Sequence, residues 1–172
     1  MGTRWGSRRS PGDHMSDELK KALEGCGAIL YGDFTLASGK KSKYYIDIKR
    51  ATTDPKVLGL IADQMARRIE GDGFQRIAGV VLGSVPLAVA LSLRTGIPFV
   101  MVRKEKKDHG TGKLIEGLLN PGEKVLVVED VITSAGSAVY AVETLRQAGA
   151  NVGTVMSVVD REEGGRDALG KL

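Results

Sequence analysis

The stretch "KVLVVEDVITSAGSAVYAVETLRQAG", residues 124–149, decides the fold. It starts with an apolar run, passes through two adjacent carboxylates and a loop of small and hydroxylated residues, and continues with apolar residues at helical spacing. Further apolar runs at 77–83, 98–104 and 152–160 predict strands, and 85–96 predicts a helix. Apolar strands that alternate with helices are typical of a parallel sheet covered on both faces. The sequence therefore predicts an α/β fold with a doubly wound parallel sheet.

Three elements are expected ahead of this core. Ser16 and the two acids after it predict a capped helix that ends near Gly25 and Gly27. Residues 28–50 mix β-forming residues with a Ser-Gly break and predict two or three short strands around a polar loop. Asp54-Pro55 predicts the start of a second helix, which Gly71 ends.

Composition limits the classes of function. The chain has 172 residues, 42% apolar and 27% charged, which fits a single soluble domain without a membrane span. Residues 1–14 carry a charge of +2 and are interpreted as a disordered leader or an added tail, so the domain is expected at 15–172. The charge left on the domain is again +2, which argues against a nucleic-acid partner. The single Cys26 favours a cytoplasmic location.

The carboxylates and the small loop point to a binding site. In open α/β sheets, ligands bind beyond the carboxyl ends of the strands, where Glu129 and Asp130 are expected. Ionised carboxylates accept hydrogen bonds and suit the two hydroxyls of a ribose, whereas a loop of small residues before a helix suits a phosphate. The combination predicts a pocket for ribose 5-phosphate. A solvated turn followed by an ordinary loop is the alternative.

With these residues in view, "VLVVEDVITSAGS" (125–137) resembles the phosphoribosyl pyrophosphate (PRPP) signature of the type I phosphoribosyltransferases. Three other stretches are similar to the orotate phosphoribosyltransferases of that family: "FTLASGKKSKYYIDIK" (34–49), "VRKEKKDHGTG" (102–112) and "VVDREEGG" (158–165). The resemblance extends over nearly all of residues 16–167. It implies the type I phosphoribosyltransferase fold with a small N-terminal hood region.

The resemblance also implies an activity. Ribose 5-phosphate would pass from PRPP to orotate, giving orotidine 5′-monophosphate and diphosphate in the pyrimidine (UMP) pathway. Mg²⁺ would be bound mainly through PRPP and the diphosphate, with no residue assigned as a metal ligand. The family pattern implies a cytoplasmic homodimer in which the charged loop 104–116, with Gly110 and Gly112 as hinges, closes over the neighbouring subunit's site. A solvated, purely surface role for that loop is the alternative.

Residue roles follow from the same match. Lys104, Asp130 and Glu129 are expected to be catalytic, and Thr133 and Arg161 to bind orotate, with Tyr44 and Tyr45 either beside the base or packed as ordinary strand aromatics. The residues expected to bind PRPP are Arg103, Lys104, Lys107, His109, Glu129, Asp130, Val131, Ile132, Thr133, Ser134, Ala135, Gly136 and Ser137.

Some positions depart from the family pattern. Ala37 and the loop "VVLGSVP" (80–86) lack lysines that many relatives carry there. Ala135 replaces a glycine, and if its φ is positive the strain is about 1 kcal/mol. The end at Leu172 predicts that a final strand of some relatives is missing.

Two other functions stay open at this point. A phosphoribosyltransferase for another base would carry the same phosphate loop, and the residues on the base side would distinguish it. A regulatory binding protein would lack the catalytic loop and would carry a DNA-binding segment, whereas "RKEKKDHGTG" is intact here.

Overall fold

The computed structural model describes residues 16–35, 39, 41–104 and 113–172. Within these residues a five-stranded sheet has the order β5-β4-β3-β6-β7. The strands are β3 (Arg76–Val80), β4 (Phe99–Val102), β5 (Ile115–Glu116), β6 (Lys124–Ile132) and β7 (Asn151–Asp160). Adjacent strands are parallel, except that β5 is antiparallel to β4. The carboxyl ends of β3, β6 and β7 therefore lie at one edge of the sheet.

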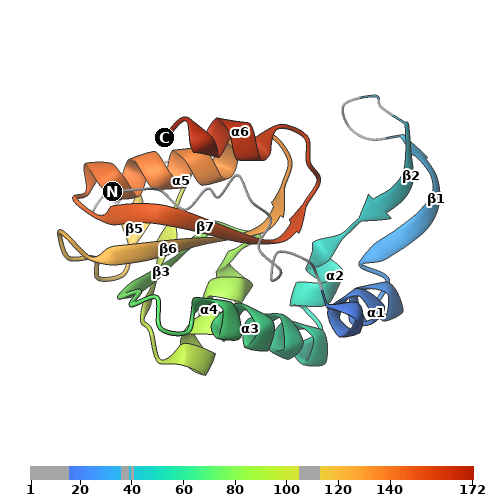
Figure 1. Cartoon of the computed structure of the whole chain (residues 1–172), viewed down its shortest axis with the longest axis horizontal. Helices are drawn as coiled ribbons and strands as arrows, with labels where there is room; N and C mark the ends of the chain where they lie inside the picture. The colour runs from blue at the N-terminus through green and yellow to red at the C-terminus, as the bar shows by residue number, and fades with distance from the viewer. Residues whose placement is uncertain (1–15, 36–38, 40, 105–112) are drawn as a thin grey trace.

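Helices cover both faces of this sheet (Figure 1). One face packs against α3 (Pro55–Ile69) and α4 (Val85–Thr95), and the other against α5 (Gly136–Gln147), with α6 (Gly165–Gly170) beside α5. Successive residues of β6 alternate between these layers, because side chains of a strand point to opposite faces. Leu126 and Val128 belong to the α3/α4 core, and Val125 and Val127 to the α5 core.

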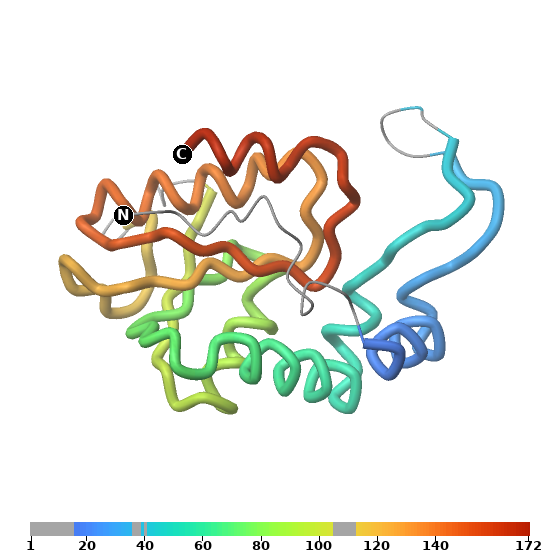
Figure 2. The backbone as a smooth tube through the Cα atoms, in the orientation of Figure 1, coloured from blue at the N-terminus to red at the C-terminus, as the bar shows by residue number. Residues whose placement is uncertain are grey.

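The N-terminal part extends the domain on one side, and its helices share the hydrophobic core of the α3/α4 layer. It consists of α1 (Asp17–Gly25), the antiparallel pair β1 (Ile29–Thr35) and β2 (Lys41–Ile46), and the short α2 (Ile48–Thr52). Ser16 caps α1, since its hydroxyl accepts a hydrogen bond from Leu19 N at 3.1 Å. The β1–β2 hairpin extends away from the sheet, while α1 and α2 join its base to α3 (Figures 1 and 2).

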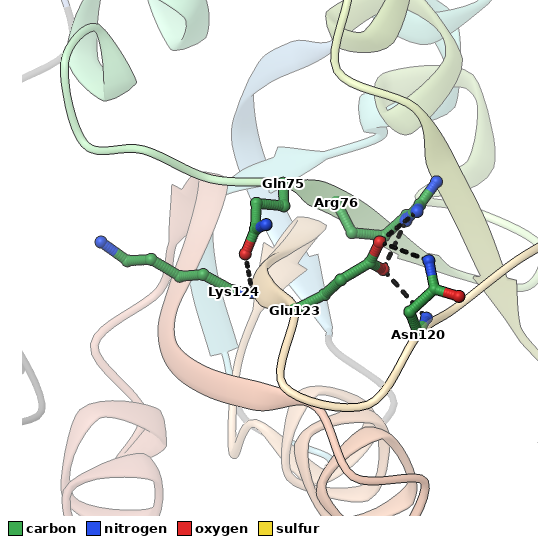
Figure 3. Close-up of polar contacts among 5 residues, drawn as sticks. All are labelled: Gln75, Arg76, Asn120, Glu123 and Lys124. Atoms are coloured by element: carbon green, nitrogen blue, oxygen red, sulfur yellow. Dashed lines mark hydrogen bonds and ion pairs between the residues drawn. The ribbon is translucent and has the colours of Figure 1, made fainter.

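A polar cluster holds the start of β3 beside the start of β6, at the edge opposite the carboxyl ends (Figure 3). Arg76 donates to both carboxylate oxygens of Glu123, through Nε at 3.0 Å and Nη2 at 2.5 Å. Asn120 donates to the same carboxylate through its backbone N at 3.1 Å and Nδ2 at 2.9 Å. The hydrogen bonds from Arg76, helped by those from Asn120, lower the pKa of Glu123 to about 2. This carboxylate is therefore ionised at neutral pH.

The predicted doubly wound α/β class is confirmed, with corrections of detail. The sheet is not wholly parallel, because the stretch expected as a loop at 104–116 contributes β5 as an antiparallel edge. Residues 48–50, expected within the hairpin region, belong instead to α2. The helix α6 follows the last strand without having been predicted. β6 continues two residues beyond the expected end at Asp130, which keeps both acids within the strand. In the described part of the chain, no helix combines the length and apolarity needed to cross a membrane.

Candidate active site

Glu129 is a buried carboxylate near the carboxyl end of β6, with 5% of its surface exposed. It accepts a hydrogen bond from the hydroxyl of Ser84, which lies between β3 and α4. Burial raises the pKa of Glu129, and the negative charge of Asp130 adds to this. The hydrogen bond from Ser84 and the positive charge of Lys104 act in the opposite direction. Lys104 therefore lies close enough to influence Glu129 electrostatically.

Asp130, the next residue, is half-buried. Its Oδ1 accepts a hydrogen bond from Val131 N at 2.8 Å, and its Oδ2 lies against the backbone of Gly83. A Cβ at position 83 would come within 2.5 Å of that oxygen, closer than packed atoms allow. The glycine thus makes room for the carboxylate.

A pocket of about 190 Å³ opens beside Glu129. Its wall is formed by Glu129 and by the continuous segment 131–138, which leads from β6 into α5. Ala135, the residue before the helix, has φ 65° and ψ 15°, and no described side chain caps α5. The first amides of α5 are therefore available for an anion, and a helix N-terminus is favourable to one. The φ of Ala135 is positive, so the condition for backbone strain at this alanine is met.

Arg161 follows β7 and lies beside this pocket, since its N–H donates to the carbonyl of Ile132 at 2.9 Å. Its guanidinium lies 5.7 Å from the ring centre of Tyr44, a residue of the N-terminal hairpin. Nε lies 3.0 Å from Glu163 Oε1 and is buried, yet it makes no hydrogen bond of good geometry to any described residue. Tyr45 packs instead on Phe34 within the hairpin, with ring centres 5.6 Å apart. The two tyrosines thus have different surroundings.

Of the other predicted residues, some lie in the described part of the chain and some outside it. Arg103 is held by its backbone, as its N–H donates to Leu114 O at 2.8 Å and its carbonyl accepts from the hydroxyl of Tyr140 at 3.0 Å. The side chains of Val131 and Ile132 pack in the core, so only their backbone can face a ligand. Outside the described residues lie Lys107, His109, Gly110, Gly112 and Ala37.

The sequence did not indicate two contributors. Ser84 stands in a loop that was remarkable only for a missing lysine. Gly165, at the start of α6, lies against the pocket segment, and a Cβ there would come within 2.6 Å of Thr133 O. In the sequence, the Gly164-Gly165 pair after Arg161 is the feature that could have indicated the close contact between Gly165 and Thr133.

Comparisons with known proteins agree with this geometry. Residues 49–169 match the family model of the phosphoribosyl transferase domain, and the chain belongs to that family. An orotate phosphoribosyltransferase of Methanosarcina mazei is 54% identical over 157 residues, which cover 91% of this chain and 84% of that one. The crystal structure of orotate phosphoribosyltransferase from Aeropyrum pernix is 38% identical, with a TM-score of 0.78 over 89% of this chain and 87% of that one.

A Mycobacterium tuberculosis orotate phosphoribosyltransferase, solved in complex with PRPP, is 33% identical. It superimposes with a TM-score of 0.72 and covers 89% of this chain and 88% of that one. Within the phosphoribosyltransferases, the chain is a member of the orotate phosphoribosyltransferase group.

Proposed function

We propose that this chain transfers ribose 5-phosphate from PRPP to orotate, giving orotidine 5′-monophosphate and diphosphate. One observation supports this most directly: the buried acid at the end of β6 and the uncapped start of α5 share one pocket. A sugar phosphate needs acceptors for its hydroxyls and donors for its phosphate within a few ångströms of each other.

The sugar would be held from two sides. Thr133, Ser134 and Ser137 offer hydroxyls, and the amides at the start of α5 offer N–H donors to the 5-phosphate. Glu129 and Asp130 would accept hydrogen bonds from the ribose hydroxyls, and their negative charge would favour the cationic character that develops at C1′. Rigid placement of the sugar lowers the entropic part of the barrier.

The leaving group needs positive charge. When the bond between C1′ and the diphosphate breaks, negative charge grows on the departing oxygens, and cations near them stabilise the transition state. Lys104 and Arg103 stand at the end of β4, and Lys104 is near enough to act on Glu129. We assign the main part of this stabilisation to Lys104, with Lys107 and His109 as further contributors from the sequence match.

Orotate would lie on the β7 side of the pocket. Arg161 can form a bidentate pair with a carboxylate, and the ring of Tyr44 flanks its guanidinium. Thr133 would lie on the same side of the pocket as Arg161, because the N–H of Arg161 donates to the carbonyl of Ile132, the residue before Thr133. An anionic base between an arginine and a phosphate loop fits orotate better than a neutral base.

Mg²⁺ is the implied cofactor. Within the described ranges no three His, Cys, Asp or Glu side chains gather where they could hold a metal ion. We infer that Mg²⁺ would arrive with the substrate, because this ion keeps several of its waters and binds readily to phosphate oxygens. Its chemistry would be to neutralise charge on the diphosphate.

We further propose that the enzyme is a cytoplasmic homodimer in which the loop after Lys104 contributes to the neighbouring site. Mixing a chain inactivated in the loop by Lys107→Ala and His109→Ala with an inactive Asp130→Asn chain tests this, because Lys104 already acts on Glu129 of its own chain. Shared sites predict that the mixture regains up to about a quarter of wild-type activity, since a random mixture contains half heterodimers with one intact site each. Sedimentation as a monomer, or a mixture without activity, would contradict the shared site.

The activity itself is tested with a panel of bases. Purified protein with Mg²⁺ and PRPP is expected to consume orotate, followed by ultraviolet absorbance, and to leave uracil, hypoxanthine and adenine unchanged. Omission of Mg²⁺ should abolish the reaction. Turnover of a purine but not of orotate would overturn the proposal.

A further inference from the structure

The hydroxyl of Ser84 has an unusual partner. Ser84 stands directly before α4, where a serine normally accepts a hydrogen bond from an amide of the first turn. Here its φ and ψ are −89° and −7°, and the hydroxyl caps no described amide of α4. It donates instead to Glu129 Oε2, across 45 positions of sequence. Helix capping therefore does not account for this serine.

Both groups of this hydrogen bond are buried. Ser84 is 1% exposed and Glu129 is 5% exposed. A buried carboxylate without a donor is unfavourable, and it is held in one orientation only by the groups that bond to it. Ser84 therefore holds Oε2 of Glu129, together with a hydrogen bond from the backbone of Asp130 to the same carboxylate, and this carboxylate lines the pocket.

The preceding residue acts on the second acid. The backbone of Gly83 lies against Asp130 Oδ2, so that any side chain at 83 would displace this oxygen. The loop between β3 and α4 thus touches both acids at the end of β6, through a hydroxyl on one and a missing side chain on the other. The contact spans two parallel neighbouring strands.

We propose that Ser84 is a positioning residue for PRPP, because its hydrogen bond orients Glu129. The absence of a side chain at Gly83 leaves room for the carboxylate of Asp130. The β3–α4 loop thus sets the geometry of both ribose-binding acids. This rests on the proposed function, because it assigns both acids to the ribose. In this role Ser84, which is not among the residues that line the pocket, acts through Glu129.

The effect of removing the hydroxyl follows from its donor role. Hydrogen bonds to charged groups are strong, so Ser84→Ala is expected to raise the KM for PRPP about tenfold or more, with the KM for orotate changed less than threefold. Among the described residues, the groups that act on Glu129 are Asp130, Lys104 and Ser84 itself. Without Ser84 the acid form of Glu129 is favoured, and the acidic limb of kcat/KM for PRPP moves to higher pH.

The experiment compares four variants with the wild type. Ser84→Ala carries the test, Ser84→Thr keeps the hydroxyl, Gly83→Ala displaces Asp130, and Ser92→Ala on α4 is the matched control. We expect Ser84→Thr and Ser92→Ala to stay within threefold of wild type in the KM for PRPP, and Gly83→Ala to raise it. A thermal unfolding curve for each variant shows whether the protein is folded at the assay temperature.

A double-mutant cycle with Glu129→Gln isolates the contact. If Ser84 acts through Glu129, then Ser84→Ala changes the KM for PRPP less than threefold in the Glu129→Gln background. Independent, multiplicative effects would overturn the inference, as would an unaltered KM in Ser84→Ala. A folded Ser84→Thr variant as impaired as Ser84→Ala would also overturn it. A wild-type protein inactive on orotate would refute the proposed function instead, which keeps the two failures distinct.

Discussion

Substitution of Glu123 by glutamine is expected to destabilise the fold without affecting catalysis. Glu123 and Arg76 form the bidentate pair at the start of β3 and β6 (Figure 3). Their side chains are only 12% and 8% exposed, so water does little to weaken the interaction. Glutamine keeps the shape of the side chain but removes its charge, which leaves Arg76 buried without a counter-ion.

The magnitude follows from the pKa. Glu123 has a pKa of about 2 in the folded protein against an ordinary value of 4.5. A difference of this size corresponds to about 3 kcal/mol of stability at pH 7, at 1.36 kcal/mol for each pKa unit. Removal of one partner from a buried pair costs a comparable amount. For a chain of this length, the melting temperature should fall by about 6 to 12 °C.

The dependence on pH has a defined sign. Because folding lowers the pKa of Glu123, the stabilisation is fully present above pH 4.5 and is lost as the pH falls towards 2. The stability curves of wild type and Glu123→Gln should therefore lie furthest apart near pH 7 and approach each other towards pH 2.

Urea denaturation at several pH values, followed by circular dichroism, measures both effects. Glu143→Gln, at an exposed position on α5, is the control and should change stability by less than about 0.5 kcal/mol. The kcat of Glu123→Gln should equal that of the wild type, because Glu123 lies at the opposite edge of the sheet from the acids. A loss below about 1 kcal/mol at pH 7, or a gap that does not close in acid, would refute the reasoning.

Three further predictions concern the site. Lys104→Ala should lower kcat about a hundredfold or more while the KM for orotate changes little, because the charge of Lys104 is needed as diphosphate departs. Steady-state kinetics check this, and equal changes in kcat and in the KM for orotate would contradict it. Arg161→Lys should raise the KM for orotate about tenfold and leave the KM for PRPP unchanged, since lysine cannot form the bidentate pair; an effect on PRPP alone would be contrary evidence. Ala135→Gly should alter the unfolding free energy by less than about 0.5 kcal/mol, because relief of about 1 kcal/mol of strain offsets the loss of a buried methyl group. A melting curve that shows a larger loss of stability would contradict this balance.

Local signals allowed much of the fold to be predicted. The pair Asp54-Pro55 fixes the start of α3, where Asp54 Oδ1 accepts hydrogen bonds from the N–H groups of Lys56 and Val57 at 2.9 and 3.1 Å. The apolar runs of β3 and β6 required burial on both faces, and their central places in the sheet provide it, whereas β7 at the edge is mostly half-buried. In these cases the cause of the structure lies within a few neighbouring residues.

The elements that were missed depend on distant contacts. β5 is only two residues long and exists because it pairs with β4. α6 is six residues long, and its Leu169 is buried in a cluster with Ala135 and Ala138. Neither has enough residues to produce a periodic pattern of its own.

The site shows the same division. The acids and the phosphate loop are consecutive in sequence, so their types and order were enough to predict a pocket. The hydrogen bond from Ser84 to Glu129 joins the loop after β3 to β6, and these two strands are neighbours only in the folded sheet. No property of "VVLGSVP" by itself indicates such a contact.

The alternation along β6 limits how this strand can change in evolution. Deleting one residue upstream of Glu129 would turn every later side chain to the other side of the sheet, because the repeat of a strand is two residues. Leucine and valine after the deletion would exchange helical layers. Asp130 would move into the place of Glu129 beside Ser84, and Glu129 would move into the place of Val128 in the α3/α4 core. Lineages of this enzyme should therefore tolerate substitutions in β6 far more readily than single insertions or deletions.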